Sequence, residues 1–199
     1  MPELVDFADP AFAARVRTRE PEALAAVVHA YLPQVLRAAR GAGLRPEAAR
    51  DTAQATFATF VEVAPRFEGR SHVRTWLFGI LYRKIAEARR EAARDRRHEQ
   101  LDDIDQVMAS RFDARGSWAR PPRSAEGLLL GKEVQGELEE CLDQAPTPQR
   151  LAFVLREVEG LGTAEICNIL EVTVTNLGVM LYRVRNRLRE CLEAKGIRR

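Results

Sequence analysis

The sequence is poor in the residues that build disulfide frameworks, metal sites and β-sheets. Only three of its 199 residues are cysteines, none in a CxxC pair, and its three histidines are scattered. This spacing predicts no tetrahedral zinc site and no other metal, and an odd cysteine count without a framework is typical of a reducing cytosol. Aromatic residues make up only 7% of the chain. Because aromatic residues are scarce and Ala, Leu, Arg and Glu are abundant, the composition favours helices over strands.

Long apolar runs and the common catalytic signatures are also missing. Nowhere do 18 consecutive apolar residues occur, and the N-terminal segment MPELVDFADPAF is acidic and not continuously apolar. We therefore expect no membrane insertion, no signal peptide and a cytoplasmic location. No P-loop, GxSxG, HExxH or paired-carboxylate pattern stands out. The sequence therefore predicts that the chain is not an enzyme and has no cofactor and no small-molecule substrate.

Charge is present in blocks. The net charge is only +2, but residues 65–100 hold ten Arg/Lys against five Asp/Glu, and residues 181–199 hold seven against two. Between these blocks, residues 101–180 hold seven basic and fourteen acidic residues. Two basic blocks around an acidic stretch indicate two contacts with a polyanion. Two solvated, Arg-rich helix faces would give the same composition, so charge alone leaves both interpretations open.

Helical periodicity organises the first half of the chain. Residues 21–40 carry an apolar stripe that starts at a proline and ends at two glycines, and a second helix is expected over 46–63. A polar loop follows at 68–71. The clearest helix comes next, with an apolar stripe made of Val73, Trp76, Leu77, Ile80, Leu81, Ile85 and Ala88. Arginines fall along another face of this helix, so one side can pack while the other meets phosphate or water. We expect Trp76 to belong to the packed side.

The second half begins with a break in the pattern. The helical pattern breaks down over residues 99–124, and a linker is predicted there from Asp102, Asp103, Asp105, Gly116, Pro121 and Pro122. Helical pattern resumes near Ala125, and Thr147 is expected to cap a further helix that ends near Gly160. A short helix at 163–170, a break and a helix from 174 to about 194 match a helix-turn-helix. An ordinary helical hairpin is the alternative for this spacing.

Two segments carry a resemblance to a known family. Asp51-Thr-Ala-Gln-Ala-Thr-Phe57 resembles the D-x-x-Q-[ED]-[TV]-F signature of sigma region two. Residues 67–78 (FEGRSHVRTWLF) resemble the F-x-G-x-S-x-[LV]-x-T-W-L-[FY] that follows it in extracytoplasmic-function (ECF) sigma factors. Residues 148–190 look like sigma region four. Two signatures in the right order are far more specific than either alone, so the chain resembles a bacterial ECF sigma factor.

The resemblance implies a fold and a function. The expected fold is all-α, with a region-two bundle at 1–98, a flexible linker at 99–124 and a region-four helix-turn-helix domain at 125–199. The implied function is an alternative-type sigma factor that binds the β′ and β subunits of core RNA polymerase and directs initiation at promoter DNA. The resemblance also implies control by an anti-sigma factor. Two other readings stay open, namely a stand-alone helix-turn-helix DNA-binding regulator and a helical protein-interaction adaptor.

The residues implied by the resemblance form three groups. Contact with a coiled coil of β′ is expected from Asp51 and Gln54. Contact with the non-template strand of the −10 element is expected from Arg70, Ser71, His72, Arg74, Arg83, Lys84 and Arg90. Contact with the major groove of the −35 element is expected from Thr175, Asn176, Val179, Tyr182, Arg183 and Arg187.

Four positions depart from the family pattern. Ala55 stands where the family usually has an acid, and Glu171 stands where the turn usually has glycine. If Glu171 is left-handed, it costs on the order of 1 kcal/mol there. Gly178 and Met180 replace polar or basic residues common early in the recognition helix. We therefore expect a promoter preference that differs from the family's usual one.

Overall fold

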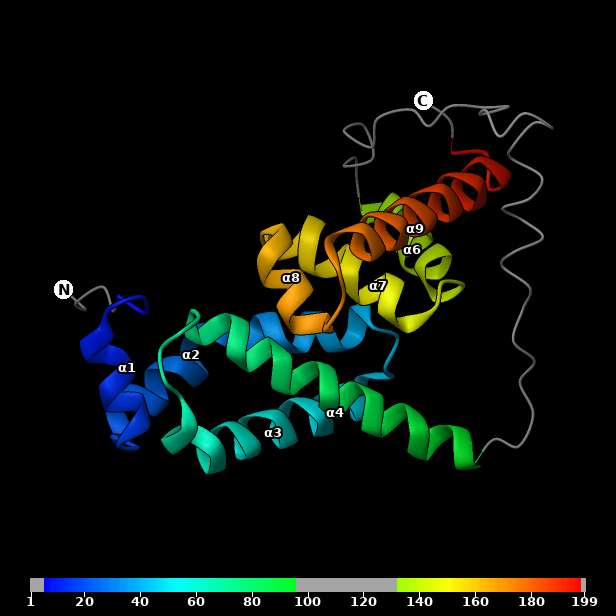
Figure 1. Ribbon diagram of the computed structural model, residues 1–199. Coiled ribbons are helices and arrows are strands. Elements are labelled where there is room, and N and C mark those ends of the chain that lie inside the picture. The colour runs from blue at the N-terminus through cyan, green and yellow to red at the C-terminus, as the bar shows by residue number, and fades with distance from the viewer. Residues whose placement is uncertain (1–5, 96–131, 198–199) are drawn as a thin grey trace.

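The computed structural model describes residues 6–95 and 132–197, and within these ranges it is built of helices without strands (Figure 1). The described helices form an N-terminal group and a C-terminal group. The expected linker at 99–124 lies outside the described residues, as does the start of the helix expected from Ala125. The all-α, two-domain fold expected from the sequence is confirmed.

The N-terminal group contains the helices expected over 21–40, 46–63 and after the loop at 68–71. Its elements are α1 (Pro10–Arg17), α2 (Pro21–Gly41), α3 (Pro46–Val63), the 3₁₀ turn η1 (Ala64–Arg66) and α4 (Val73–Asp95). Proline opens α1, α2 and α3, where its missing N–H costs nothing because first-turn donors have no partner within the helix. The eight-residue α1 was not predicted, because Phe12 and Val16 are its only large apolar residues, too few to show a helical period.

Aromatic and aliphatic side chains hold this group together. Phe60 of α3 and Leu77 and Leu81 of α4 are fully buried, and α2 packs across both helices. Trp76 is partly buried, with its ring centroid 5.7 Å from that of Phe60 and 4.9 Å from that of Phe67. The prediction that Trp76 belongs to the packed side of α4 is therefore confirmed.

The C-terminal group contains the helix-turn-helix. Its elements are α6 (Lys132–Asp143), α7 (Thr147–Phe153), the π-helical turn η3 (Val154–Val158), α8 (Thr163–Leu170) and α9 (Val174–Ala194). The prediction that Thr147 caps α7 was wrong by one residue. Helix α7 already includes Thr147, so Pro146 occupies the cap position. No side chain accepts a hydrogen bond from the backbone there.

A three-residue turn joins α8 to α9 and bends the chain by 94°. Glu171 adopts the left-handed conformation, with φ 56° and ψ 43°, so the cost anticipated for a non-glycine residue applies. Thr173 then caps α9, because its hydroxyl oxygen accepts a hydrogen bond of 3.2 Å from the backbone N–H of Asn176. This geometry confirms the helix-turn-helix. In the described part of the chain no single helix is long and apolar enough to cross a membrane; only α8 and α9 taken together across their bend meet those criteria.

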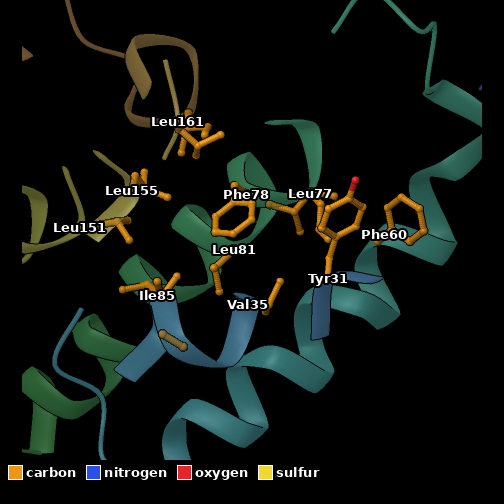
Figure 2. Packing of buried hydrophobic residues seen from close by; sticks show 14 of the residues in the cluster. Tyr31, Val35, Phe60, Leu77, Phe78, Leu81, Ile85, Leu151, Leu155 and Leu161 are labelled. Atoms are coloured by element: carbon orange, nitrogen blue, oxygen red, sulfur yellow. The ribbon is translucent and has the colours of Figure 1, made fainter. Parts of the chain in front are cut away.

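The two groups of helices lie face to face and share one apolar core. Helix α8 packs on α4, and α7 with η3 packs on α2 (Figure 1). Figure 2 shows the result, in which Leu155 and Leu161 of the C-terminal group meet Phe78, Leu81 and Ile85 of α4. The sequence predicted two domains but not this direct packing between them.

A second, smaller apolar cluster lies between α6 and α9. It consists of Cys141, Leu142, Ala145, Val184, Leu188 and Leu192. Within it, Cys141 is disulfide-bonded to Cys191, with Cα atoms 5.7 Å apart, whereas Cys167 is free and partly buried. The expectation of no disulfide framework was therefore wrong for two of the three cysteines, because residues 50 positions apart in sequence are adjacent on neighbouring helices.

Candidate functional site

Helix α3 presents a polar outer face. Asp51 and Gln54, three residues apart, are both exposed, while Thr52, Ala53 and Phe57 point into the core. Ala55 is partly buried at the edge of this face. The two residues expected to contact polymerase are thus brought together on an open surface, and the acid that the family usually carries at position 55 would lie beside it.

The loop between η1 and α4 opens on a cavity. Phe67 is buried and anchors the loop, and Gly69 has a φ of +71°, a left-handed value that glycine adopts without strain. A cavity of about 320 Å³ lies between this loop and α1. It is lined by Phe7, Ala8, Asp9, Pro10, Ala13, Ala14, Arg17, Phe67, Glu68, Gly69, Arg70, Ser71 and His72. Three residues expected at the −10 element therefore border one hollow, and α1 forms its second wall.

Local contacts differ among these loop residues. Arg70 is almost fully exposed and pairs with Glu68 at 2.6 Å. His72 is half-buried, with its ring edge-on to that of Tyr31, and its Nδ1 accepts a hydrogen bond of 3.1 Å from the backbone N–H of Arg74. Burial and the nearby Arg74 charge lower the pKa of His72. The imidazole is therefore neutral at pH 7, which suits its role as an acceptor.

The basic residues of α4 fall into two sets. Lys84 pairs with Glu87 at 2.9 Å, and Arg90 donates to the carbonyl oxygen of Ala86, so both are held along their own helix. Arg74 and Arg83 instead reach the C-terminal group. The Arg74 guanidinium lies 3.8 Å from the Glu165 carboxylate, and that of Arg83 lies 2.7 Å from Glu171. Two of the α4 residues expected to hold DNA, Arg74 and Arg83, therefore face carboxylates of the C-terminal group.

Among the six residues of α9 expected to contact the −35 element, those near the start of the helix are the most exposed. Thr175, Asn176 and Val179 are exposed, as expected of a surface that reads bases. Tyr182 and Arg183 are partly buried. Arg187 is also partly buried, and its guanidinium donates a hydrogen bond to the carbonyl oxygen of Gln144. The first turns of the helix are thus the open part of the expected −35 surface.

Two departures in α9 have different structural meanings. Gly178 is exposed, and a Cβ added there would meet nothing within 4 Å, so the position can carry a side chain toward a partner. Met180 is 8% exposed and belongs to the apolar core. Position 180 therefore faces inward and needs an apolar side chain, so this departure from the family pattern does not change the surface expected to meet DNA.

Several polar contacts between the two groups were missed by sequence reasoning. Thr75 donates its hydroxyl hydrogen to Glu165 at 2.9 Å, and Arg37 of α2 makes two hydrogen bonds of 3.1 Å to Glu159. The only sign of these contacts in the sequence was the excess of acidic over basic residues in 101–180, which does not tell which residues pair. Among the described residues, no group of three or more His, Cys, Asp or Glu side chains could hold a metal ion.

Comparison with known families matches both halves of the chain. The family model described as Sigma-70 region 2 covers residues 27–95, which include α2, α3 and α4. The model described as Sigma-70, region 4 covers residues 135–188, which include the helix-turn-helix. These ranges contain every residue expected to contact polymerase, the −10 element or the −35 element.

Curated relatives and solved structures agree with these matches. A probable RNA polymerase sigma factor of Haemophilus influenzae is 32% identical over 154 residues, which cover 74% of this chain and 78% of the relative. The ECF RNA polymerase sigma-E factor of Escherichia coli K12 is 26% identical over 68% of this chain and 69% of its own length.

Two solved complexes show the same fold. One contains CnrH with the cytosolic domain of CnrY (TM-score 0.64, 20% identity, 94% of this chain and 98% of that chain). The other contains the sigma factor RpoE with the anti-sigma factor NepR from Bartonella quintana (TM-score 0.60, 23% identity, 83% of this chain and 94% of that chain). Taken with the two family matches and the relative at 32% identity, these results show that the chain belongs to the RNA polymerase sigma factors, is of the ECF type and directs transcription initiation.

Proposed function

We propose that the two groups of helices divide promoter recognition between them. Residues 1–98 hold core polymerase and the −10 element, residues 125–199 read the −35 element, and residues 99–124 connect them. The observation that supports this division is that α3 exposes Asp51 and Gln54 and that the first turns of α9 expose Thr175, Asn176 and Val179, while the opposite face of each helix is buried. We further propose that the chain acts in the cytoplasm and catalyses no reaction, since synthesis of RNA belongs to the polymerase.

The polymerase contact is assigned to the outer face of α3. Asp51 supplies a carboxylate that can pair with an arginine, and Gln54 supplies an amide that can donate and accept beside it. Both are exposed and neither contributes to the core, so this face is available to the β′ subunit.

The −10 contact is assigned to the loop at 68–72 and to the basic side of α4. Opening a promoter requires a base to leave the stack, which costs a few kcal/mol, so the protein must hold that base once it is out. The cavity beside the loop combines the aromatic rings of Phe7 and Phe67 with polar groups at its rim, and both kinds of contact stabilise an unstacked base. Arg74, Arg83, Lys84 and Arg90 then lie along α4, where they can follow the phosphates.

The −35 contact is assigned to the exposed face of α9. Asn176 can pair with adenine in the major groove, and Val179 can contact the methyl group of thymine. Arg183 and Arg187 lie farther from the start of the helix, where contacts with phosphate are expected.

Reconstituted transcription tests the proposed function. Purified protein with bacterial core polymerase should initiate RNA synthesis at its own promoter, and the protein alone should bind promoter duplex only weakly. Tight, sequence-specific duplex binding without polymerase would instead support a stand-alone regulator. Absence of DNA binding both with and without polymerase would support a protein-interaction adaptor.

We also propose that an anti-sigma factor controls this chain. Support comes from the structural neighbour from Bartonella quintana, which was solved with such a partner. Isolation of the protein from its native host should recover a small partner encoded nearby. Constitutive activity in the host without any partner would refute this part of the proposal.

A further inference from the structure

The start of helix α9 carries no charged side chain. Residues 174–179 (VTNLGV), which we call the open turns of α9, are all exposed but one. Val174 and Val179 are exposed to 64% and 40%, although both are apolar. The sequence has no charged residue between Glu171, in the turn before the helix, and Arg183. The part of α9 that is most open to a partner is therefore neutral and partly apolar.

Helix stability does not account for the residues of the open turns. Valine, threonine and asparagine are weak helix formers and glycine is weaker still, so an exposed helix position is better filled by alanine, lysine or glutamate. The open turns nevertheless contain two valines, a threonine, an asparagine and a glycine. Thr173 offsets part of this cost, because its hydroxyl oxygen accepts from the backbone N–H of Asn176 and caps the helix. Contact with a partner explains these residues better than folding does.

The open turns lack a side chain that reads guanine. In the major groove guanine is read mainly by arginine or lysine, which donates two hydrogen bonds to its O6 and N7 atoms. The first basic residue of α9, Arg183, lies about 13.5 Å along the helix axis from Val174, and its Nε is buried. Arg185 and Arg187 lie farther on, and both are held by other residues of the C-terminal group. No guanidinium therefore lies where the helix meets bases.

The groups that remain in the open turns suit A·T base pairs. The side-chain amide of Asn176 makes no hydrogen bond within the described part of the chain, so it is available to N6 and N7 of adenine. Val174 and Val179 present methyl groups to the methyl group of thymine, and Thr175 lies between them. At Gly178 an added Cβ would meet nothing within 4 Å, so the glycine leaves room for a base edge to come close.

We propose that the open turns of α9 select A·T base pairs in the −35 element. Val174 and Val179 contact thymine methyl groups, and Asn176 pairs with an adenine. This inference rests on the proposed function, which places α9 in the major groove of that element. Arg183 and Arg187, which are assigned to phosphates, add affinity without base preference. Promoter choice at the −35 element thus depends on apolar contact with thymine more than on charged contact with guanine.

The first test is selection of DNA by the holoenzyme. The full-length chain is assembled with bacterial core polymerase and offered its own promoter as a pool randomised across the −35 element. We expect the bound molecules to be enriched in A·T pairs. If G·C pairs predominate instead, the inference fails while the proposed −35 contact stands. A pool without any enrichment would refute the assignment of α9 to the −35 element, and the inference with it.

The second test removes the thymine methyl groups alone. Deoxyuridine replaces thymine at the selected positions, which leaves base pairing intact. Each contacted methyl group that is lost should weaken holoenzyme binding about fourfold. Val179→Ala should be less sensitive to the replacement than the wild type, because its shorter side chain already lacks one contact. Equal affinity of the wild type for thymine and deoxyuridine promoters would overturn the inference.

The third test adds a guanidinium to the open turns. Gly178→Arg places it at an exposed site with free space around the new Cβ, so this variant should prefer guanine over adenine at one base pair by about tenfold. Gly136→Arg in α6 is the matched control, since Gly136 is also exposed and an added Cβ there also meets nothing within 4 Å. The control lies beside the C-terminal end of α9, because the neighbouring Glu137 pairs with Lys195. It adds the same charge and should keep the wild-type preference. If both variants select the same sequences, the open turns do not lie against base edges and the inference is wrong.

Discussion

The disulfide between Cys141 and Cys191 allows a stability change to be worked out from the structure. The bond closes a segment with a sequence separation of 50 residues and lies in a cluster that holds α6 on α9. Closing a loop of this length removes chain entropy from the unfolded state worth about 4 kcal/mol at 25 °C. The described C-terminal group spans only residues 132–197, a size at which covalent cross-links contribute a large share of stability.

Reduction of the bond is therefore expected to destabilise the chain by up to about 4 kcal/mol. If the chain unfolds as a single unit, this corresponds to a fall in Tm of roughly 8–16 °C. The assay is thermal unfolding of the oxidised protein with and without a thiol reductant, together with titration of free thiols. One thiol should react in the unfolded oxidised protein and three after reduction.

Cysteine variants distinguish the loss of the disulfide from other effects of the reductant. Cys141→Ala/Cys191→Ala should unfold near the temperature of the reduced wild type and should not respond to reductant. Cys167→Ala, which removes the free thiol, should retain the full response. A wild-type Tm that reductant leaves unchanged, or three reactive thiols after exposure to glutathione disulfide, would refute the reasoning.

Four other perturbations give separate checks. Asp51→Arg should weaken binding to core polymerase while changing stability by less than about 0.5 kcal/mol, whereas Glu22→Arg, with the same charge change on α2, should leave core affinity intact; equal core affinities of the two variants would remove Asp51 from the contact. Asn176→Ala should cost roughly 1–3 kcal/mol of holoenzyme affinity and relax preference at one base pair of the −35 element, and an unchanged base-preference profile would show that this face of α9 is misassigned. Arg187→Ala should weaken binding to all −35 variants about equally and reduce the salt dependence by roughly one unit of slope. The lowered pKa of His72 means that the unfolded chain binds more protons, so the contribution of His72 to stability is present above about pH 6.5 and is lost as the pH falls below it. Denaturant unfolding at pH 5.5 and 7.5 should show this loss in the wild type and a smaller one in His72→Gln.

Helix positions and the family signatures could be obtained from the sequence because both depend on local information. The apolar stripes of α2 and α4 predicted those helices, and the residues from 174 to 194 were predicted as α9. A helix of this length repeats its pattern several times, so the period is clear. Prediction failed where a helix has few large apolar residues, as in α1, and where the boundary depends on cap geometry, as at Thr147.

Side-chain direction was harder to obtain than helix position. The departure at Met180 was expected to affect promoter preference, yet Met180 is buried, because α9 contacts the core with a broader stripe than leucine spacing alone suggests. Asn176 and Val179, by contrast, were placed correctly on the exposed face. Counting along a helix gives relative angles, but which arc is covered depends on the neighbouring helices.

The sequence by itself determined the all-α class, the order of the helices and the membership in the sigma factors, since each of these follows from local periodicity or from contiguous motifs. Only the tertiary structure decided how charges far apart in sequence meet. Thr75 and Glu165 are 90 residues apart and Arg83 and Glu171 are 88 apart, yet both pairs are in contact. No pattern along the chain encodes such a pairing, because it arises when the apolar faces of α4 and α8 pack and bring their polar borders together.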